Sequence, residues 1–193
     1  MRILIALLLM IPFADTAQPL PCNYGVIDSS QHSMAFAQLH EKYDRIVAYT
    51  TEGYWQSNVI YYALIAEKQG VYYKGTMICK RKVDKSWLAP VLKMKPANTK
   101  KAKVIIDKLN EANLWKIKTD SLNNQIHHNA DGYSVASSLS DGTNYRFELI
   151  AGDKFIAIEA YEPDWFAEKL PEYTQRKQFI KIRDEFLKAY KIL

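Results

Sequence analysis

The spacing of apolar residues along the chain predicts six strands in two groups of three. Within each segment apolar and polar side chains alternate or apolar residues run together, as expected of strands with at least one buried face. The segments are residues 45–50, 59–66 and 71–79 in the first half and 133–140, 145–150 and 155–161 in the second. Turn residues separate the members of each group, so each group predicts an antiparallel meander.

The register of these hairpins predicts which side chains share a face. With a two-residue loop at residues 69–70, Tyr62 and Cys79 point to one apolar face. Two-residue loops in the second group place Phe147 beside Ile158 on its apolar face. We therefore expect one packed side and one solvated side of the sheet, with Cys79 pointing inward.

The solvated face of the second group carries two carboxylates. In the predicted register Glu148 and Glu159 share this face, with Val135 beside Glu148 and Arg146 opposite Glu159. Paired carboxylates can serve general acid–base catalysis. We expect ordinary surface residues here instead, because the face is polar and Arg146 supplies a partner.

Two stretches with apolar residues three or four positions apart predict helices. One follows Asn98, a residue type that caps helix N-termini, and the other follows Pro171. The apolar stripes are Ala102, Ile105, Ile106, Leu109 and Ala112 in the first and Phe179, Ile182, Phe186, Leu187 and Tyr190 in the second. The predicted fold class is α+β, with an antiparallel sheet of about six strands and two long helices packed on one face. Two small sheets, each with its own helix, are the alternative.

The N-terminal residues have the three parts of a secretory signal peptide. Arg2 supplies a positive charge, residues 3–14 are apolar, and small residues follow up to Ala17. This apolar run is shorter than the roughly 20 residues that a membrane-spanning helix needs. The sequence therefore predicts removal of residues 1–17 on export. Residues 18–193 then form one secreted or periplasmic domain without a transmembrane segment.

Export also accounts for the two cysteines. Cys22 and Cys79 are the only pair in the sequence, and an oxidising compartment allows them to join. Such a bridge would stabilise the fold by about 4 kcal/mol. We expect this disulfide rather than a catalytic or metal-binding thiol pair, because the sequence has no C-x-x-C spacing. A lipid anchor on Cys22 is a weaker alternative, since Pro21 stands where a small residue is usual.

Basic residues are concentrated in the middle of the chain. Residues 74–103 hold ten lysines and arginines against one acid, although the formal net charge of the whole chain is only +5. Residues 141–172 hold eight acids and three bases. This separation of charge can steer an anionic partner to the basic segment. The candidate contact residues are Lys80, Arg81, Lys82, Lys85 and Trp87.

The expected partner of the basic segment is an acidic protein or an anionic envelope component, either a polymer or phospholipid headgroups. Nucleic acid is not expected outside the cytoplasm. Two alternatives need no partner: the segment is a solvated loop, or it contacts the acidic half of its own chain.

Few residues suggest catalysis or metal binding. His127 and His128, with Asp131 a few positions on, are the best metal-ligand candidates. A second cluster of ligands is missing from the sequence, so we expect a solvated loop there. Glycine patterns of serine hydrolases, Walker-type loops and dinucleotide sites are also missing. The sequence therefore predicts neither a metal nor a cofactor.

These features together favour a non-catalytic exported binding protein, such as an inhibitor, an immunity-type protein or an envelope accessory factor. A cell-envelope hydrolase with an unrecognised active site is one alternative. A structural or assembly partner that uses the basic face or an exposed sheet edge is the other.

Overall fold

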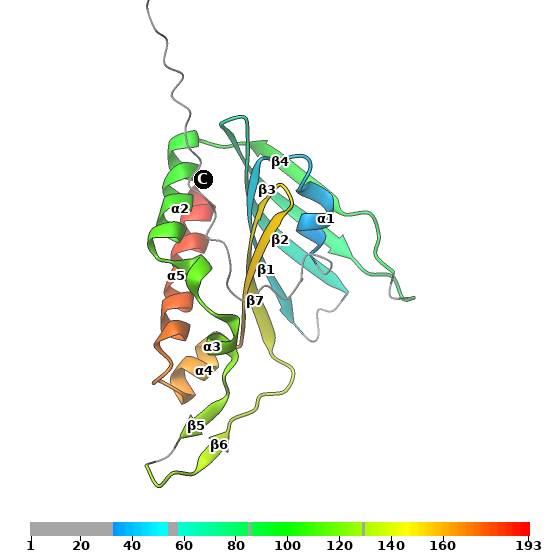
Figure 1. Ribbon diagram of the computed structural model, residues 1–193. Coiled ribbons are helices and arrows are strands. Elements are labelled where there is room, and N and C mark those ends of the chain that lie inside the picture. Colours follow the sequence, from blue (N-terminus) through cyan, green and yellow to red (C-terminus); the bar gives the residue numbers. More distant parts are fainter. Residues whose placement is uncertain (1–32, 54–57, 85, 129) are drawn as a thin grey trace, which may run out of the picture.

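The computed structural model describes residues 33–53, 58–84, 86–128 and 130–193. Within them, a six-stranded antiparallel sheet has the order β4-β3-β2-β1-β7-β8 (Figure 1). Its strands are β1 (Arg45–Gly53), β2 (Val59–Lys68), β3 (Val71–Lys80), β4 (Val91–Pro96), β7 (Thr143–Ala151) and β8 (Lys154–Tyr161). A separate two-stranded sheet consists of β5 (Ile126–His128) and β6 (Ser134–Ala136).

Helices cover both faces of the large sheet. The helices are α1 (Met34–Leu39), α2 (Thr99–Glu111), α3 (Thr119–Asn123), α4 (Pro163–Lys169) and α5 (Thr174–Ile192), with a 3-10 turn η3 (Leu114–Lys116). Figure 1 shows α2 and α5 together on one side of the sheet, which we call the helix side, and α1 on the opposite side, the α1 side. The described chain thus has an α+β fold with one large antiparallel sheet, and the prediction of two small sheets with a helix each is wrong.

Local hairpin geometry follows the predicted registers. Tyr62 pairs with Met77 between β2 and β3, and Phe147 pairs with Ile158 between β7 and β8. Gly70 lies in the β2–β3 turn with φ of +74°, a conformation that glycine adopts without steric cost. The short loops therefore determine these two pairings, as the sequence predicts.

The second predicted meander is wrong, because β6 does not pair with β7. Its residues 134–136 are exposed and pair with β5, so Val135 lies opposite His127 instead of beside Glu148. Strand β7 pairs with β1 on that side, and Ala48 is the residue opposite Glu148. The physical reason is burial: β1 is buried on both of its faces and has far more apolar surface to offer a neighbour than β6 has.

The prediction of one solvated side is also wrong. The register of β1 places Tyr49 between Ala63 and Phe147 on the helix side. On the α1 side the same register places Ala48 beside Leu64. The apolar faces of the two hairpins therefore point to opposite sides of the sheet, and each side has its own core.

The helix-side core forms where α2 and α5 meet the sheet. Asn98 caps α2, since its side-chain oxygen accepts a hydrogen bond from the Lys101 N–H at 3.0 Å. The predicted stripe of α2 is buried from Ala102 to Leu109. In α5 the ring of Phe186 lies 5.2 Å from that of Phe147, in an edge-to-face contact. The α1-side core is smaller and includes Ala35 and Leu39 of α1 with Ile46, Tyr62, Leu64, Met77 and Cys79 of the sheet.

The two edges of the large sheet differ. On the outer edge of β8, Asn123 of α3 accepts a hydrogen bond from the Tyr161 N–H at 2.8 Å and donates one to the Glu159 carbonyl at 3.3 Å. Helix α3 therefore occupies this edge. The opposite edge strand, β4, carries exposed Lys93 and Lys95.

The predicted signal peptide and Cys22 lie outside the described residues, so export and the disulfide remain predictions. Cys79 is fully buried on the α1 side, as predicted. Burial, together with the charge of Glu148, raises the pKa of this thiol to about 11. Among the described helices, none combines the length and the apolar composition that a membrane crossing requires.

Leu39→Ala tests whether the α1 side is a true core. Leu39 is fully buried, so we expect truncation to lower the free energy of unfolding by about 3 kcal/mol. Val104→Ala, at an exposed position of α2, is the control and should change it by less than about 0.5 kcal/mol. Urea denaturation measures both, and equal small effects would contradict a packed α1 side.

Candidate functional site

Most of the predicted contact residues lie in a hairpin that continues β3 beyond the sheet. The Leu88 N–H donates to the Lys80 carbonyl at 2.8 Å, and the Lys82 N–H donates to the Ser86 carbonyl at 2.7 Å. Residues 80–84 and 86–88 therefore form an antiparallel extension, which we call the β3–β4 hairpin. It projects from the end of the sheet in Figure 1.

Side chains of the hairpin combine positive charge with an aromatic contact. Arg81 pairs with Trp87 across the hairpin, and the Arg81 guanidinium carbon lies 4.4 Å from the centroid of the Trp87 ring. Lys80 and Lys82 are exposed. The structure thus brings four of the five predicted contact residues together, and the fifth, Lys85, lies outside the described residues.

More lysines continue this charge along the helix side of β3 and β4. Lys74 lies opposite Lys95 and Thr76 opposite Lys93. Because side chains of a strand alternate between faces, these residues and Lys80 point to the same side. We define the basic surface as Lys74, Lys80, Lys93 and Lys95 of the sheet, which share the helix side, with Lys82 of the hairpin; Arg81 and Trp87 lie on the α1 side of the hairpin, where Trp87 packs against the α1-side core.

Helices leave one corner of this face uncovered. Tyr61 of β2 and Val91 of β4 belong to the same face and are 56% and 50% exposed. Their neighbour Ile78 lies between them in the sheet. The corner therefore offers apolar area beside the lysines.

A shallow cleft of about 200 Å³ lies where the end of α5 meets β3 and β4, lined by Lys74, Gly75, Thr76, Lys93, Met94, Lys95 and Tyr190. The Lys74 ammonium donates to the Tyr190 carbonyl at 2.5 Å and lies 4.4 Å from its ring centroid. Burial and the nearby Lys95 lower the pKa of Lys74. The Lys74 ammonium is therefore engaged within the cleft, and Lys93 and Lys95 are the exposed basic residues at its rim.

In the described part of the chain, the basic segment forms no ion pairs with the acidic half. Among the described residues, no ion pair joins a lysine or arginine of positions 74–103 to a carboxylate. The acidic residues of β7 and β8 lie at the other end of the strand order. Of the two alternatives that need no partner, intramolecular docking therefore has no ion pair in its favour among the described residues.

A buried charge cluster on the α1 side escaped the sequence prediction. Glu148 is fully buried, so its predicted surface position is wrong. Its Oε2 accepts a hydrogen bond from Ser33 Oγ at 2.6 Å, and its Oε1 lies 2.9 Å from Arg146 Nε. Arg146 also lies 3.5 Å from Glu159, in the predicted cross-strand register. Burial raises the pKa of Glu148, against the opposing effects of Arg146 and Ser33.

This cluster holds α1 on the sheet. Ser33 is the N-cap of α1: its Oγ accepts from the Phe36 N–H at 3.0 Å while its hydroxyl donates to Glu148. With its carboxylate sealed from solvent, Glu148 has no contact with a substrate in this conformation. We therefore assign the cluster a structural role.

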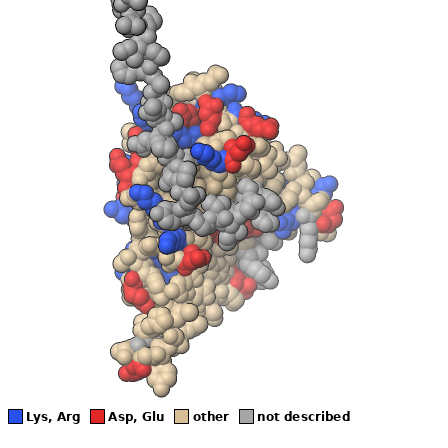
Figure 2. Space-filling view, viewed as in Figure 1, with Lys and Arg blue, Asp and Glu red and all other residues tan. Residues whose placement is uncertain are grey.

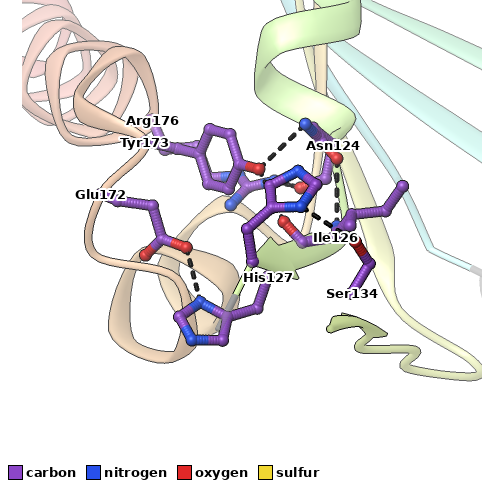
Figure 3. A network of polar contacts seen from close by, with 8 residues as sticks. Asn124, Ile126, His127, Ser134, Glu172, Tyr173 and Arg176 are labelled. Atoms are coloured by element: carbon purple, nitrogen blue, oxygen red, sulfur yellow. Dashed lines mark hydrogen bonds and ion pairs between the residues drawn. The ribbon is translucent and has the colours of Figure 1, made fainter. Parts of the chain in front are cut away.

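The two adjacent histidines point to different partners (Figure 3). They lie in β5 instead of the predicted loop. His127 Nδ1 is 2.8 Å from Glu172 Oε1, and His128 Nδ1 is 2.9 Å from Ser134 Oγ. Asp131 is exposed. In the part of the chain that the structure describes, no three His, Cys, Asp or Glu side chains are grouped as metal ligands.

Arg176 of α5 anchors this region (Figure 3). It is fully buried and donates from Nε to the Leu122 carbonyl at 2.7 Å and from Nη2 to the Asn124 carbonyl. The Tyr173 hydroxyl donates to the Ile126 carbonyl at 2.6 Å. These side chains donate hydrogen bonds to main-chain carbonyls in and next to β5. The bonds explain why β5 lies against α5.

Comparisons with protein-family models, with curated proteins and with solved structures found no match to this chain. The binding properties of the basic surface are therefore inferred from its geometry and charge. Ammonium and guanidinium groups can bind anions through charge-assisted hydrogen bonds. The predicted contact residues did not include Lys74, Lys93 and Lys95. The alternation of side chains along a strand is the sequence signal that could have placed these lysines on one face with Lys80.

The buried cluster predicts a pH-dependent stability defect in Arg146→Met. Removing the arginine leaves the carboxylate of Glu148 without its counter-charge and raises its pKa in the folded state further. When a carboxyl group has a higher pKa in the folded state than in the unfolded state, its protonated form stabilises the fold. This stabilisation is complete below the unfolded-state pKa and is lost as the pH rises through the folded-state pKa. The variant should therefore lose about 3 kcal/mol at about pH 8 and clearly less at about pH 5.

Urea denaturation of the wild type and the variant at both pH values measures this difference. The double variant Arg146→Met, Glu148→Gln is the control, because a neutral amide at position 148 does not titrate. Its difference from the wild type should change much less with pH. An equal loss at both pH values for Arg146→Met would contradict the role given to Glu148.

Proposed function

We propose that this protein is an exported, non-catalytic binding protein whose basic surface contacts an anionic partner. The observation that supports it is the concentration of lysines on β3, β4 and the β3–β4 hairpin without carboxylate partners among the described residues. Export is proposed from the signal-peptide pattern of residues 1–17 alone.

Self-repulsion within the basic surface favours an external partner. Lys74 and Lys95 lie directly opposite each other, an arrangement of like charges that destabilises a sheet. Lys100, Lys101 and Lys103 lie in the first turns of α2, where positive charge opposes the helix dipole and no acid is present. An anionic partner would offset both effects. Lys74 and Lys101 also contact carbonyls at the end of α5, so part of this charge has a structural role.

The shape of the surface favours a large partner. Lys80, Lys82, Lys93 and Lys95 are exposed on an edge of the sheet and a projecting hairpin. Such a surface cannot enclose a small molecule, and tight small-ligand sites are usually concave. A polymer, a protein or a membrane can instead contact many of the lysines at once.

The assembly alternative has one observation in its favour. Strand β4 ends the sheet on one side, whereas Asn123 occupies the outer edge of β8 on the other. An open edge can pair with a strand of another chain. Lys93 and Lys95 oppose pairing with a second copy of β4, so an acidic strand is the better partner for this edge.

Charge reversal tests the proposed function. We expect the protein to bind soluble dextran sulfate, with an affinity that falls as salt rises. Lys93→Glu with Lys95→Glu should lower that affinity about 25-fold or more, because each lysine near an anionic surface contributes about fivefold. Fluorescence anisotropy with labelled polymer measures it.

Lys154→Glu with Lys181→Glu is the matched control for this experiment. It makes the same change in net charge at exposed positions of β8 and α5. Its affinity should stay within about threefold of the wild type. Equal losses in the two double variants would show that only net charge matters and would contradict a localised binding surface.

A further inference from the structure

We infer that the partner of the basic surface is an anionic lipid surface, into which the β3–β4 hairpin inserts Val83. This inference rests on the proposed function and names the class of partner. It follows from an apolar residue at the hairpin tip, from the basic residues behind that tip, and from the projecting shape.

Val83 is fully exposed at the tip of the hairpin. The hydrogen bond between Lys82 and Ser86 closes the hairpin, so Val83 lies in the turn itself. Turns favour Gly, Pro, Asn, Asp and Ser, and a branched apolar residue gains nothing from full contact with water. Residues that break a local rule in this way often mark functional positions.

The carboxylate of Asp84, next to Val83, is held by hydrogen bonds within the turn. Asp84 Oδ1 accepts hydrogen bonds from the Ser86 N–H at 2.9 Å and from the Ser86 hydroxyl at 2.6 Å. Its carboxylate is therefore engaged in shaping the turn. This arrangement lowers the pKa of Asp84, with the Ser86 hydroxyl as the largest cause.

Basic and aromatic residues lie directly behind the tip. Lys80 and Lys82 are exposed along the hairpin, and Arg81 stacks on Trp87. Leu88 adds a further exposed apolar side chain, 43% exposed. Membrane-interface proteins use this order: an apolar tip in the acyl boundary, aromatic rings at headgroup depth, and lysines and arginines on the phosphates.

Shape distinguishes a lipid surface from the other anionic partners. In Figure 2 the hairpin projects from the right side of the molecule, as a convex feature rather than a groove. An acidic polymer would contact the lysines but would leave Val83 in water. A bilayer satisfies the lysines and the valine together, because phosphates and acyl chains lie within a few ångströms of each other.

Vesicle co-sedimentation tests the inference with two neutral substitutions at the tip. The probes are vesicles of equimolar phosphatidylglycerol and phosphatidylcholine, vesicles of phosphatidylcholine alone, and soluble dextran sulfate. Val83→Ser should lower the affinity for anionic vesicles about tenfold and leave dextran sulfate binding unchanged. Val83→Trp should raise the affinity for anionic vesicles, because tryptophan favours the membrane interface.

Val135→Ser is the matched control, since Val135 is an exposed valine of β6, far from the hairpin. It should bind vesicles as the wild type does. All variants share the same N-terminal residues, so any contribution of that segment to vesicle binding cancels. Urea denaturation should show wild-type stability for the variants at position 83, because the side chain has no packing to lose.

The outcomes separate this inference from the proposed function. Salt-dependent binding to dextran sulfate without binding to anionic vesicles overturns the lipid partner and leaves an acidic polymer or protein. Vesicle binding that Val83→Ser does not weaken overturns insertion of the tip. Binding to neither probe overturns the proposed function itself.

Discussion

The pairing of β1 with both β2 and β7 is the constraint on which the rest of the structure depends. It joins two hairpins that are distant in the sequence, and its register decides which of their faces lie together. Tyr49 aligns with Phe147 on the helix side, whereas Ala48 aligns with Leu64 on the α1 side. Since both sides are then apolar, neither can stay in water, and the fold needs α1 as well as α2 and α5.

The same constraint explains the buried charge. In β7 the residue next to Phe147 must point to the α1 side, and that residue is Glu148. A lone buried carboxylate is costly, so its contacts with Arg146 and Ser33 are required for the fold to tolerate it. The contact with Ser33 also fastens α1, which couples the smaller core to the charge cluster.

Strand order determines where the basic surface lies. With β1 inside the sheet between β2 and β7, β4 becomes an edge strand and the lysines of β3 and β4 gather at one end. Helix α3 occupies the opposite edge through Asn123. The chain therefore presents one closed edge and one basic edge, and the β3–β4 hairpin extends from the basic one. This asymmetry supports the proposal that one end of the molecule meets its partner.

The sequence by itself determined the local features of this protein. Short loops pair Tyr62 with Met77 and Phe147 with Ile158, and Asn98 caps α2, because each feature depends on residues close together in the chain. Only the tertiary structure decided the pairing of β1 with β7, the side to which each hairpin turns its apolar face, and the burial of Glu148. The physical reason is that strand alternation shows that a strand has two faces but not which neighbour lies beside it. That choice depends on the total apolar area buried between segments far apart in sequence.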